Sequence, residues 1–132
     1  MRCITTAYIT RRTLAVLLLL TLGALATASP GYRDVTVHDL RAAQQRGALI
    51  LDVRTSVEYA AGHVQGTQLL AVADLAGCMS EVPARQTVYV ICRSGARTAH
   101  ASALLEQDIR NVTGGMNTWQ AAGYPVKIGG RP

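Results

Sequence analysis

Cysteine is scarce in this sequence, with three residues, Cys3, Cys78 and Cys92, in a chain of 132. Cys3 precedes an apolar N-terminal run and is expected to be removed with it, which leaves two cysteines. Two cysteines are too few for the disulfide framework that holds many small secreted folds together. The sequence also lacks a Cys-x-x-Cys pair and a histidine cluster, so it predicts no metal site and no cofactor.

Long blocks of like charge are also absent. The three arginines of residues 1–28 account for much of the basic excess, and the remainder has 10 basic and 8 acidic residues, a net charge of +2. Without a basic block the chain offers no predicted face for nucleic acid. No internal repeat or low-complexity tract is present, and the length fits one domain.

The first 28 residues have the features of a secretory signal peptide. Arg11 and Arg12 precede an uncharged, mostly apolar run of 14 residues, and Ala26-Thr27-Ala28 places small side chains at the −3 and −1 positions before Ser29. The run is shorter than the roughly 20 residues that a membrane-spanning helix needs, which favours cleavage over an uncleaved anchor. The arginine pair leaves the choice between a general secretory and a twin-arginine route open.

These features predict a signal peptide at residues 1–28 and a mature domain at residues 29–132. A cleaved signal peptide implies a periplasmic or secreted protein with no stable membrane insertion after cleavage.

The mature part alternates strand-like and helix-like segments. Short β-branched, apolar segments predict buried strands at residues 35–37, 49–53, 67–70, 87–91 and 109–112. Helices are expected at residues 39–46, 56–60, 74–78 and 117–122, and from Thr98 onward, with Asp39 and Ser56 as caps. This alternation predicts an α/β fold: a parallel sheet with helices on both faces, in a single domain.

A cysteine opens the loop between the expected strand 87–91 and the helix that follows it. A strand, tight loop and helix direct backbone N–H groups at one point beyond the carboxyl end of the sheet. A sulfur placed there lies near the positive end of the helix dipole, which favours the thiolate. Arg93 and Arg97 add positive charge, and Gly95 permits a sharp turn. The surroundings therefore favour Cys92 as a nucleophile for a small anionic substrate over an inert buried cysteine.

The loop Cys92-Arg93-Ser94-Gly95-Ala96-Arg97 resembles the active-site loop of the rhodanese (sulfurtransferase) family. The chain resembles further motifs of that family, in the same order, at Leu51–Arg54, Glu58–Gly66, Gly114–Trp119 and Gly123–Val126, with Gln65 where proline is usual. The resemblance extends from about Asp34 to Val126. A Gly-aromatic turn usual in the family is missing after Leu105, so we expect the preceding helix to end early.

The resemblance implies the rhodanese-like fold and a sulfurtransferase activity. The implied reaction moves sulfane sulfur from thiosulfate or a persulfide donor to a thiol or cyanide acceptor, through a persulfide on the catalytic residue Cys92. The implied substrate-binding residues are Arg93, Ser94, Gly95, Ala96, Arg97 and Thr98. Small molecules are the expected partners, and no protein partner is identified.

Two other functions remain open alternatives. One is a non-catalytic rhodanese-like module that binds or carries sulfur. The other is a cysteine phosphatase or arsenate reductase, which uses a Cys-x5-Arg loop sized for a tetrahedral oxyanion. The spacing from Cys92 to Arg97 is Cys-x4-Arg, one residue shorter, and disfavours that function.

Several individual roles are also left open by the sequence. Arg97 either contacts the donor or pairs with Asp52 or Glu58, and Thr98 either bonds the sulfur or caps the helix. Structural roles are expected for the remaining candidates: Asp52, Arg54, His63, His100 and Trp119.

Cys78 has no basic or glycine-rich surroundings in the sequence, so we expect it to be dispensable for sulfur transfer. The competing possibility is a Cys78–Cys92 disulfide that inactivates the protein.

Exported protein is predicted to begin at or near Ser29, because the small residues Ala26 and Ala28 precede it. N-terminal sequencing of exported material checks this position. A membrane-bound protein that retains Met1 would contradict the cleavage.

Overall fold

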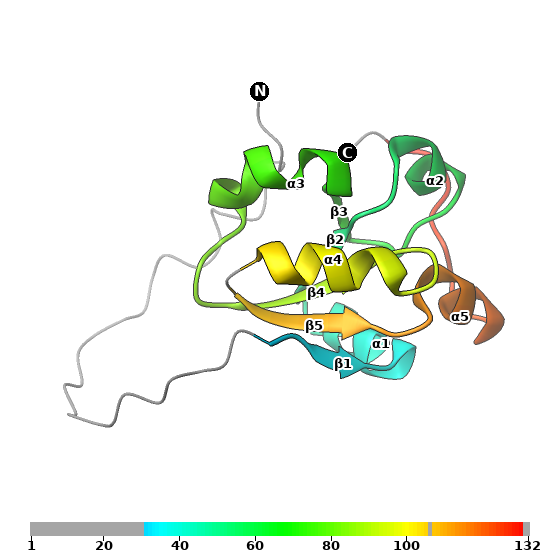
Figure 1. Ribbon diagram of the computed structural model, residues 1–132. Helices are drawn as coiled ribbons and strands as arrows, with labels where there is room; N and C mark the ends of the chain where they lie inside the picture. Colours follow the sequence, from blue (N-terminus) through cyan, green and yellow to red (C-terminus); the bar gives the residue numbers. More distant parts are fainter. Residues whose placement is uncertain (1–30, 106, 131–132) are drawn as a thin grey trace.

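The computed structural model describes residues 31–105 and 107–130, so the predicted signal peptide, its cleavage site and Cys3 lie outside the described residues. The described chain forms one five-stranded sheet, in the order β1-β5-β4-β2-β3 (Figure 1). Every neighbouring pair is parallel. The strands are β1 (Arg33–Val35), β2 (Leu49–Asp52), β3 (Gln68–Leu69), β4 (Thr87–Ile91) and β5 (Asp108–Val112).

Helices cover both faces of this sheet, as predicted. They are α1 (Val37–Gln45), α2 (Ser56–Ala61), α3 (Val72–Cys78), η2 (Met79–Glu81), α4 (Ala96–Leu104) and α5 (Gly115–Ala121). One core cluster joins the sheet to α3 and α4, and another joins it to α1 and α5. Figure 1 shows α4 on one side of the sheet and α1 on the other. The α/β fold is therefore confirmed, and none of the helices in residues 31–105 and 107–130 is long and apolar enough to cross a membrane.

The first two helices begin with capping boxes, and the residues that cap them differ from those predicted. Thr36 caps α1, since its side chain accepts from the Asp39 N–H and the Asp39 carboxylate accepts from the Thr36 N–H. Thr55 and Glu58 do the same for α2. The prediction of Asp39 and Ser56 as caps was wrong because, in this pattern, the threonine is the cap and the acidic residue three positions on reciprocates. The first strand accordingly ends at Val35, before the cap, and not at residue 37.

Three later helices begin two residues earlier than predicted. The helices expected from Thr98 and residue 117 begin at Ala96 and Gly115, each after a left-handed glycine and without a side-chain cap. The helix expected from residue 74 begins at Val72 and has no side-chain cap either. Such starts lack the polar capping residue by which a helix start is identified in a sequence. The early end of α4, at Leu104, is confirmed.

The amino end of α5 fastens the loop between β4 and α4. The N–H of Met116 donates to the carbonyl of Cys92 at 2.8 Å, and the N–H of Asn117 donates to the carbonyl of Arg93 at 3.0 Å. Gly115 has a φ of +54°, and a Cβ built on it would lie 2.2 Å from the carbonyl oxygen of Cys92. Only glycine therefore allows α5 to approach the loop this closely.

Gly115→Ala is predicted to lower the free energy of unfolding by roughly 3 kcal/mol, through backbone strain and the clash with Cys92. Gly123→Ala is the matched control, because Gly123 has a φ of +73° with nothing within 4 Å of the added Cβ. The control is expected to lose only about 1 kcal/mol, from strain alone. Urea unfolding of both variants gives the comparison, and equal losses would show that close approach to the loop is not what Gly115 provides.

Candidate active site

The sulfur of Cys92 lies at the amino end of α4, directly after β4. The N–H of Gly95 donates to Sγ at 3.0 Å, and the hydroxyl oxygen of Thr98 lies 3.6 Å from Sγ. Cys92 is fully buried. The structure thus brings the predicted nucleophile to the positive end of a helix dipole, at the carboxyl end of a central strand.

The proton of the Thr98 hydroxyl has two possible acceptors. In the structure this hydroxyl donates to the carbonyl of Gly95 at 2.6 Å. A hydroxyl has a single proton, so in the thiol form the S–H of Cys92 is the donor and the Thr98 oxygen the acceptor. When the sulfur ionises, it becomes an acceptor only, and the Thr98 proton has to turn toward it to keep the contact. Thr98 therefore bonds the sulfur from inside α4, which is one of its two predicted roles. It does not fill the other role, helix capping, because α4 has no side-chain cap.

Two opposing effects set the pKa of the Cys92 thiol. Burial raises the pKa, because a buried thiolate loses its contact with water. Hydrogen bonds from the Thr98 hydroxyl and from the backbone N–H groups of Thr98, Gly95 and Ser94 lower it by more. The net pKa lies below the ordinary thiol value, so the thiolate fraction at neutral pH is larger than for a free cysteine.

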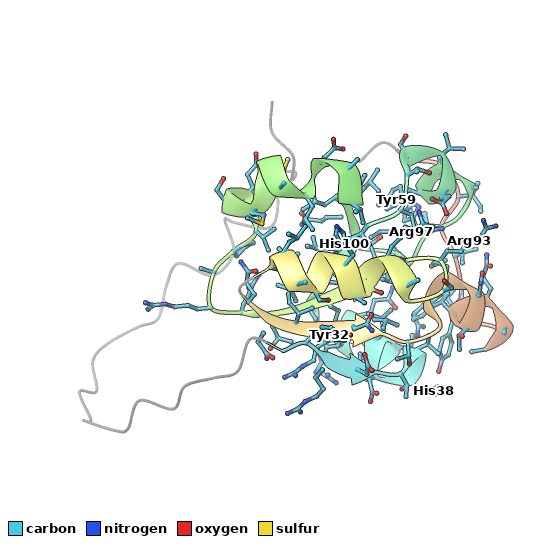
Figure 2. The ribbon with its side chains drawn as sticks, in the orientation of Figure 1. Tyr32, His38, Tyr59, Arg93, Arg97 and His100 are labelled. Atoms are coloured by element: carbon cyan, nitrogen blue, oxygen red, sulfur yellow. The ribbon has the colours of Figure 1, made fainter. Side chains whose placement is uncertain are left out.

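The predicted substrate-binding residues line the loop with different exposures. Arg93, Ser94 and Ala96 are exposed, and Gly95 is half-buried. The Arg93 guanidinium makes no hydrogen bond or ion pair with another described residue. Figure 2 shows Arg93 and Arg97 at the same end of the molecule, where α2 and α5 lie. Arg93 is thus a free cation at the mouth of the loop.

Arg97 is held by a carboxylate from another helix. Its two terminal nitrogens donate to Glu58 at 2.7 and 2.8 Å, in a two-pronged ion pair between α4 and α2. Hydrogen bonding with Arg97 is the main cause that keeps the pKa of Glu58 well below its usual range, against the opposing effect of burial. Of the two partners that the sequence left open for Arg97, the structure selects Glu58.

Asp52 pairs with Arg54 and not with Arg97. Arg54 donates to both carboxylate oxygens of Asp52, at 2.6 to 3.1 Å, and this pair is buried. The same guanidinium also donates to the carbonyls of Glu58 and Gly62, at 3.2 and 2.8 Å. Arg54 therefore ties α2 to the end of β2, which confirms the structural role expected for it and for Asp52.

The remaining candidates take the structural places expected of them. His63 is buried, stacks on Tyr59 and lies 2.9 Å from the Tyr59 carbonyl through Nδ1, so it fixes the chain after α2. His100 is exposed on α4, and Trp119 is fully buried in the core. Cys92 is a free cysteine, so the structure contains no Cys78–Cys92 disulfide.

One contribution to the site was not predicted from the sequence. The role of the amino end of α5 in bonding the loop carbonyls was not anticipated, although the consecutive glycines Gly114 and Gly115 were a visible signal of close packing. Within the part of the chain that the structure describes, no group of three His, Cys, Asp or Glu side chains is placed to hold a metal ion. The chemistry available here is that of a stabilised thiolate beside a free cation.

Comparison with known proteins gives a consistent family. A sulfurtransferase of Allochromatium vinosum is 34% identical over 90 residues, which cover 65% of this chain and 84% of that protein. A thiosulfate sulfurtransferase GlpE of Pseudoalteromonas translucida is 34% identical over 84 residues, 61% of this chain and 79% of that protein. The crystal structure of a rhodanese-related protein from Thermoplasma volcanium superimposes with a TM-score of 0.68 at 28% identity, covering 74% of this chain and 99% of that one. The rhodanese-like domain family matches residues 36–122, and this chain belongs to that family.

Proposed function

We propose that this chain is a sulfurtransferase that carries sulfane sulfur as a persulfide on Cys92, taking it from thiosulfate or a persulfide donor and passing it to a thiol or cyanide acceptor. The observation that carries the proposal is the position of the sulfur, 3.0 Å from the Gly95 N–H at the amino end of α4, which has no side-chain cap. Two relatives named as sulfurtransferases support the same reaction class. We further propose that the protein acts outside the cytoplasm after cleavage of residues 1–28.

The first half-reaction loads the enzyme. The Cys92 thiolate attacks the outer sulfur of the donor, a new S–S bond forms, and the donor's own S–S bond breaks. With thiosulfate, the thiolate and the dianion become a persulfide anion and sulfite, so the total charge is conserved. Arg93 at the mouth attracts the anionic donor, and the loop N–H groups stabilise the persulfide anion.

The second half-reaction returns the enzyme to its thiolate. An acceptor thiolate or cyanide attacks the outer sulfur of the persulfide, and the bond to Cys92 breaks. No general base is needed, because the attacking and leaving groups are already anions. The buried position of Cys92 favours a narrow donor that can bring a terminal sulfur into the loop. This proposal therefore assigns small sulfur species as the substrates.

Cys92→Ser is predicted to abolish turnover with thiosulfate and cyanide, because a serine hydroxyl is not ionised near neutral pH and forms no persulfide. Wild-type protein incubated with thiosulfate should gain one sulfur atom at Cys92 by mass spectrometry, and its steady-state kinetics should be double displacement. Cys78→Ser, a substitution at the end of α3, is the control and should keep turnover near wild type.

Each alternative function has its own signature in these measurements. A sulfur carrier would load one sulfur atom at Cys92 without catalytic turnover. A phosphatase would hydrolyse aryl phosphates faster than it moves sulfur. Substantial sulfur transfer by Cys92→Ser would show that another group is the nucleophile.

Thr98→Val is predicted to raise the pKa of the Cys92 thiol, since valine matches threonine in size but cannot donate a hydrogen bond to the thiolate. The pH profile of alkylation by iodoacetamide measures this pKa: the wild-type midpoint should lie below that of a free cysteine, and the variant midpoint should move up toward it. Thr98→Ser keeps the hydroxyl and should retain the wild-type midpoint. Identical midpoints for wild type and Thr98→Val would rule out the hydroxyl as a stabiliser of the thiolate.

A further inference from the structure

The two arginines of the active loop are electrostatically unequal. Arg97 shares its charge with the Glu58 carboxylate through two short hydrogen bonds, whereas Arg93 has no partner among the described residues. Near the sulfur, the thiolate contributes one negative charge, Arg93 one positive charge, and the Glu58–Arg97 pair contributes none. The formal side-chain charges that meet an incoming donor therefore sum to about zero, although the loop sequence contains two cations.

The Glu58 carboxylate is fixed in its place by groups besides Arg97. Its Oε2 also accepts from the N–H of Thr55 at 3.1 Å and from the Thr55 hydroxyl at 3.0 Å, as part of the α2 capping box. Arg54 in turn anchors α2 to the end of β2. The negative charge beside Arg97 is thus built into the fold, and it is not a mobile side chain that a substrate readily displaces.

Arg97 is close enough to the sulfur for this neutralisation to matter. It lies in the first turn of α4, five residues after Cys92, and its side chain is 37% exposed. Hydrogen bonding with Glu58 is the main cause that raises the pKa of Arg97, and the charge of Cys92 also contributes. An unpaired Arg97 would accordingly strengthen the attraction of the site for anions.

We propose that Glu58 is a specificity-determining residue, which by neutralising Arg97 shifts the site from doubly charged sulfur donors toward singly charged ones. The proposal rests on the proposed function, since it concerns the donor of the same reaction. The favoured class is the singly charged persulfides and thiosulfonates, and the disfavoured member is the thiosulfate dianion. Glu58 acts through Arg97 and does not touch the donor.

Two donors of matched chemistry isolate the charge. Thiosulfate and methanethiosulfonate both present a terminal sulfane sulfur bonded to an oxidised sulfur, but they carry two charges and one. In each case the Cys92 thiolate forms an S–S bond to the outer sulfur, and the old S–S bond breaks. Sulfite leaves from the first donor and methanesulfinate from the second, so atoms and charge balance in both. The measured quantity is the ratio of kcat/KM for thiosulfate to kcat/KM for methanethiosulfonate.

Three variants change the charge of the pair in steps. Glu58→Gln gives the pair a charge of +1, Arg97→Gln gives −1, and the double variant is neutral like the wild type. Glutamine suits a capping box as well as glutamate does, so Glu58→Gln keeps the start of α2. Both kcat/KM values are measured on the same preparation of each variant, so a smaller fraction of folded enzyme lowers both equally and leaves their ratio unchanged. Asp39→Asn, the equivalent change in the α1 capping box, is the matched control.

At low ionic strength the ratio should rise about three- to tenfold in Glu58→Gln and fall by a similar factor in Arg97→Gln. The double variant should return to within about twofold of wild type, as should the Asp39→Asn control. A ratio that moves in the same direction in both single variants, or that stays within about twofold of wild type in both, would overturn the proposal. A purely bracing role of the ion pair would give one of these two outcomes, because removing either partner then disturbs the site in the same way.

A measurement on the wild type alone gives an independent test. A nearly neutral site predicts that kcat/KM changes less than about twofold for either donor between roughly 20 and 200 mM ionic strength. A steep fall for thiosulfate alone would contradict it, because that fall requires an unneutralised cation pair. Failure of the underlying function looks different: neither donor would then add a sulfur atom to Cys92 by mass spectrometry.

Discussion

The structure depends on the contact between the Cys92 sulfur and the amino end of α4. The helices α1 and α2 begin with a threonine oxygen that accepts a backbone N–H, but α4 begins with Gly95 and has no such oxygen. Buried N–H groups need an acceptor, and the sulfur supplies it at Gly95. The group that completes the helix is therefore also the reactive one, and a thiolate fills this position better than a thiol, because it only accepts.

Charges around the loop follow from this arrangement. A cation in the first turn of a helix is unfavourable with respect to the helix dipole, yet Arg97 lies there. Two anions offset it: the carboxylate of Glu58, which α2 supplies, and the sulfur of Cys92 when it is ionised. The buried Asp52–Arg54 pair has another role, since its guanidinium also donates to the carbonyl of Glu58 in α2 and to that of Gly62 directly after α2. The Asp52–Arg54 pair thus holds α2 in place, and α2 carries the Glu58 carboxylate that pairs with Arg97.

Most of the sheet could be predicted from the sequence, because buried parallel strands are short, apolar and β-branched, as at residues 49–53 and 87–91. The position of Cys92 after a central strand followed from the same pattern. Helix starts were less predictable. Gly95 and Gly114 stand at the cap positions of α4 and α5 without a side-chain bond. Thr36 and Thr55 do cap helices, but they lie three residues and one residue before the residues predicted as caps. Local patterns indicate that a helix exists more reliably than they indicate its first residue.

The partner of Arg97 could not have been chosen from the sequence, for a physical reason. Glu58 is 39 residues from Arg97, and Asp52 stands at the end of the strand next to β4, so each was a plausible partner. The choice is made by Arg54, which takes both carboxylate oxygens of Asp52 and draws α2 to the end of β2. Only then does Glu58, held by its capping box, face Arg97. The charge at an active loop is therefore a property of the assembled fold: a second arginine in the motif adds positive charge only if no neighbouring element brings a carboxylate to it.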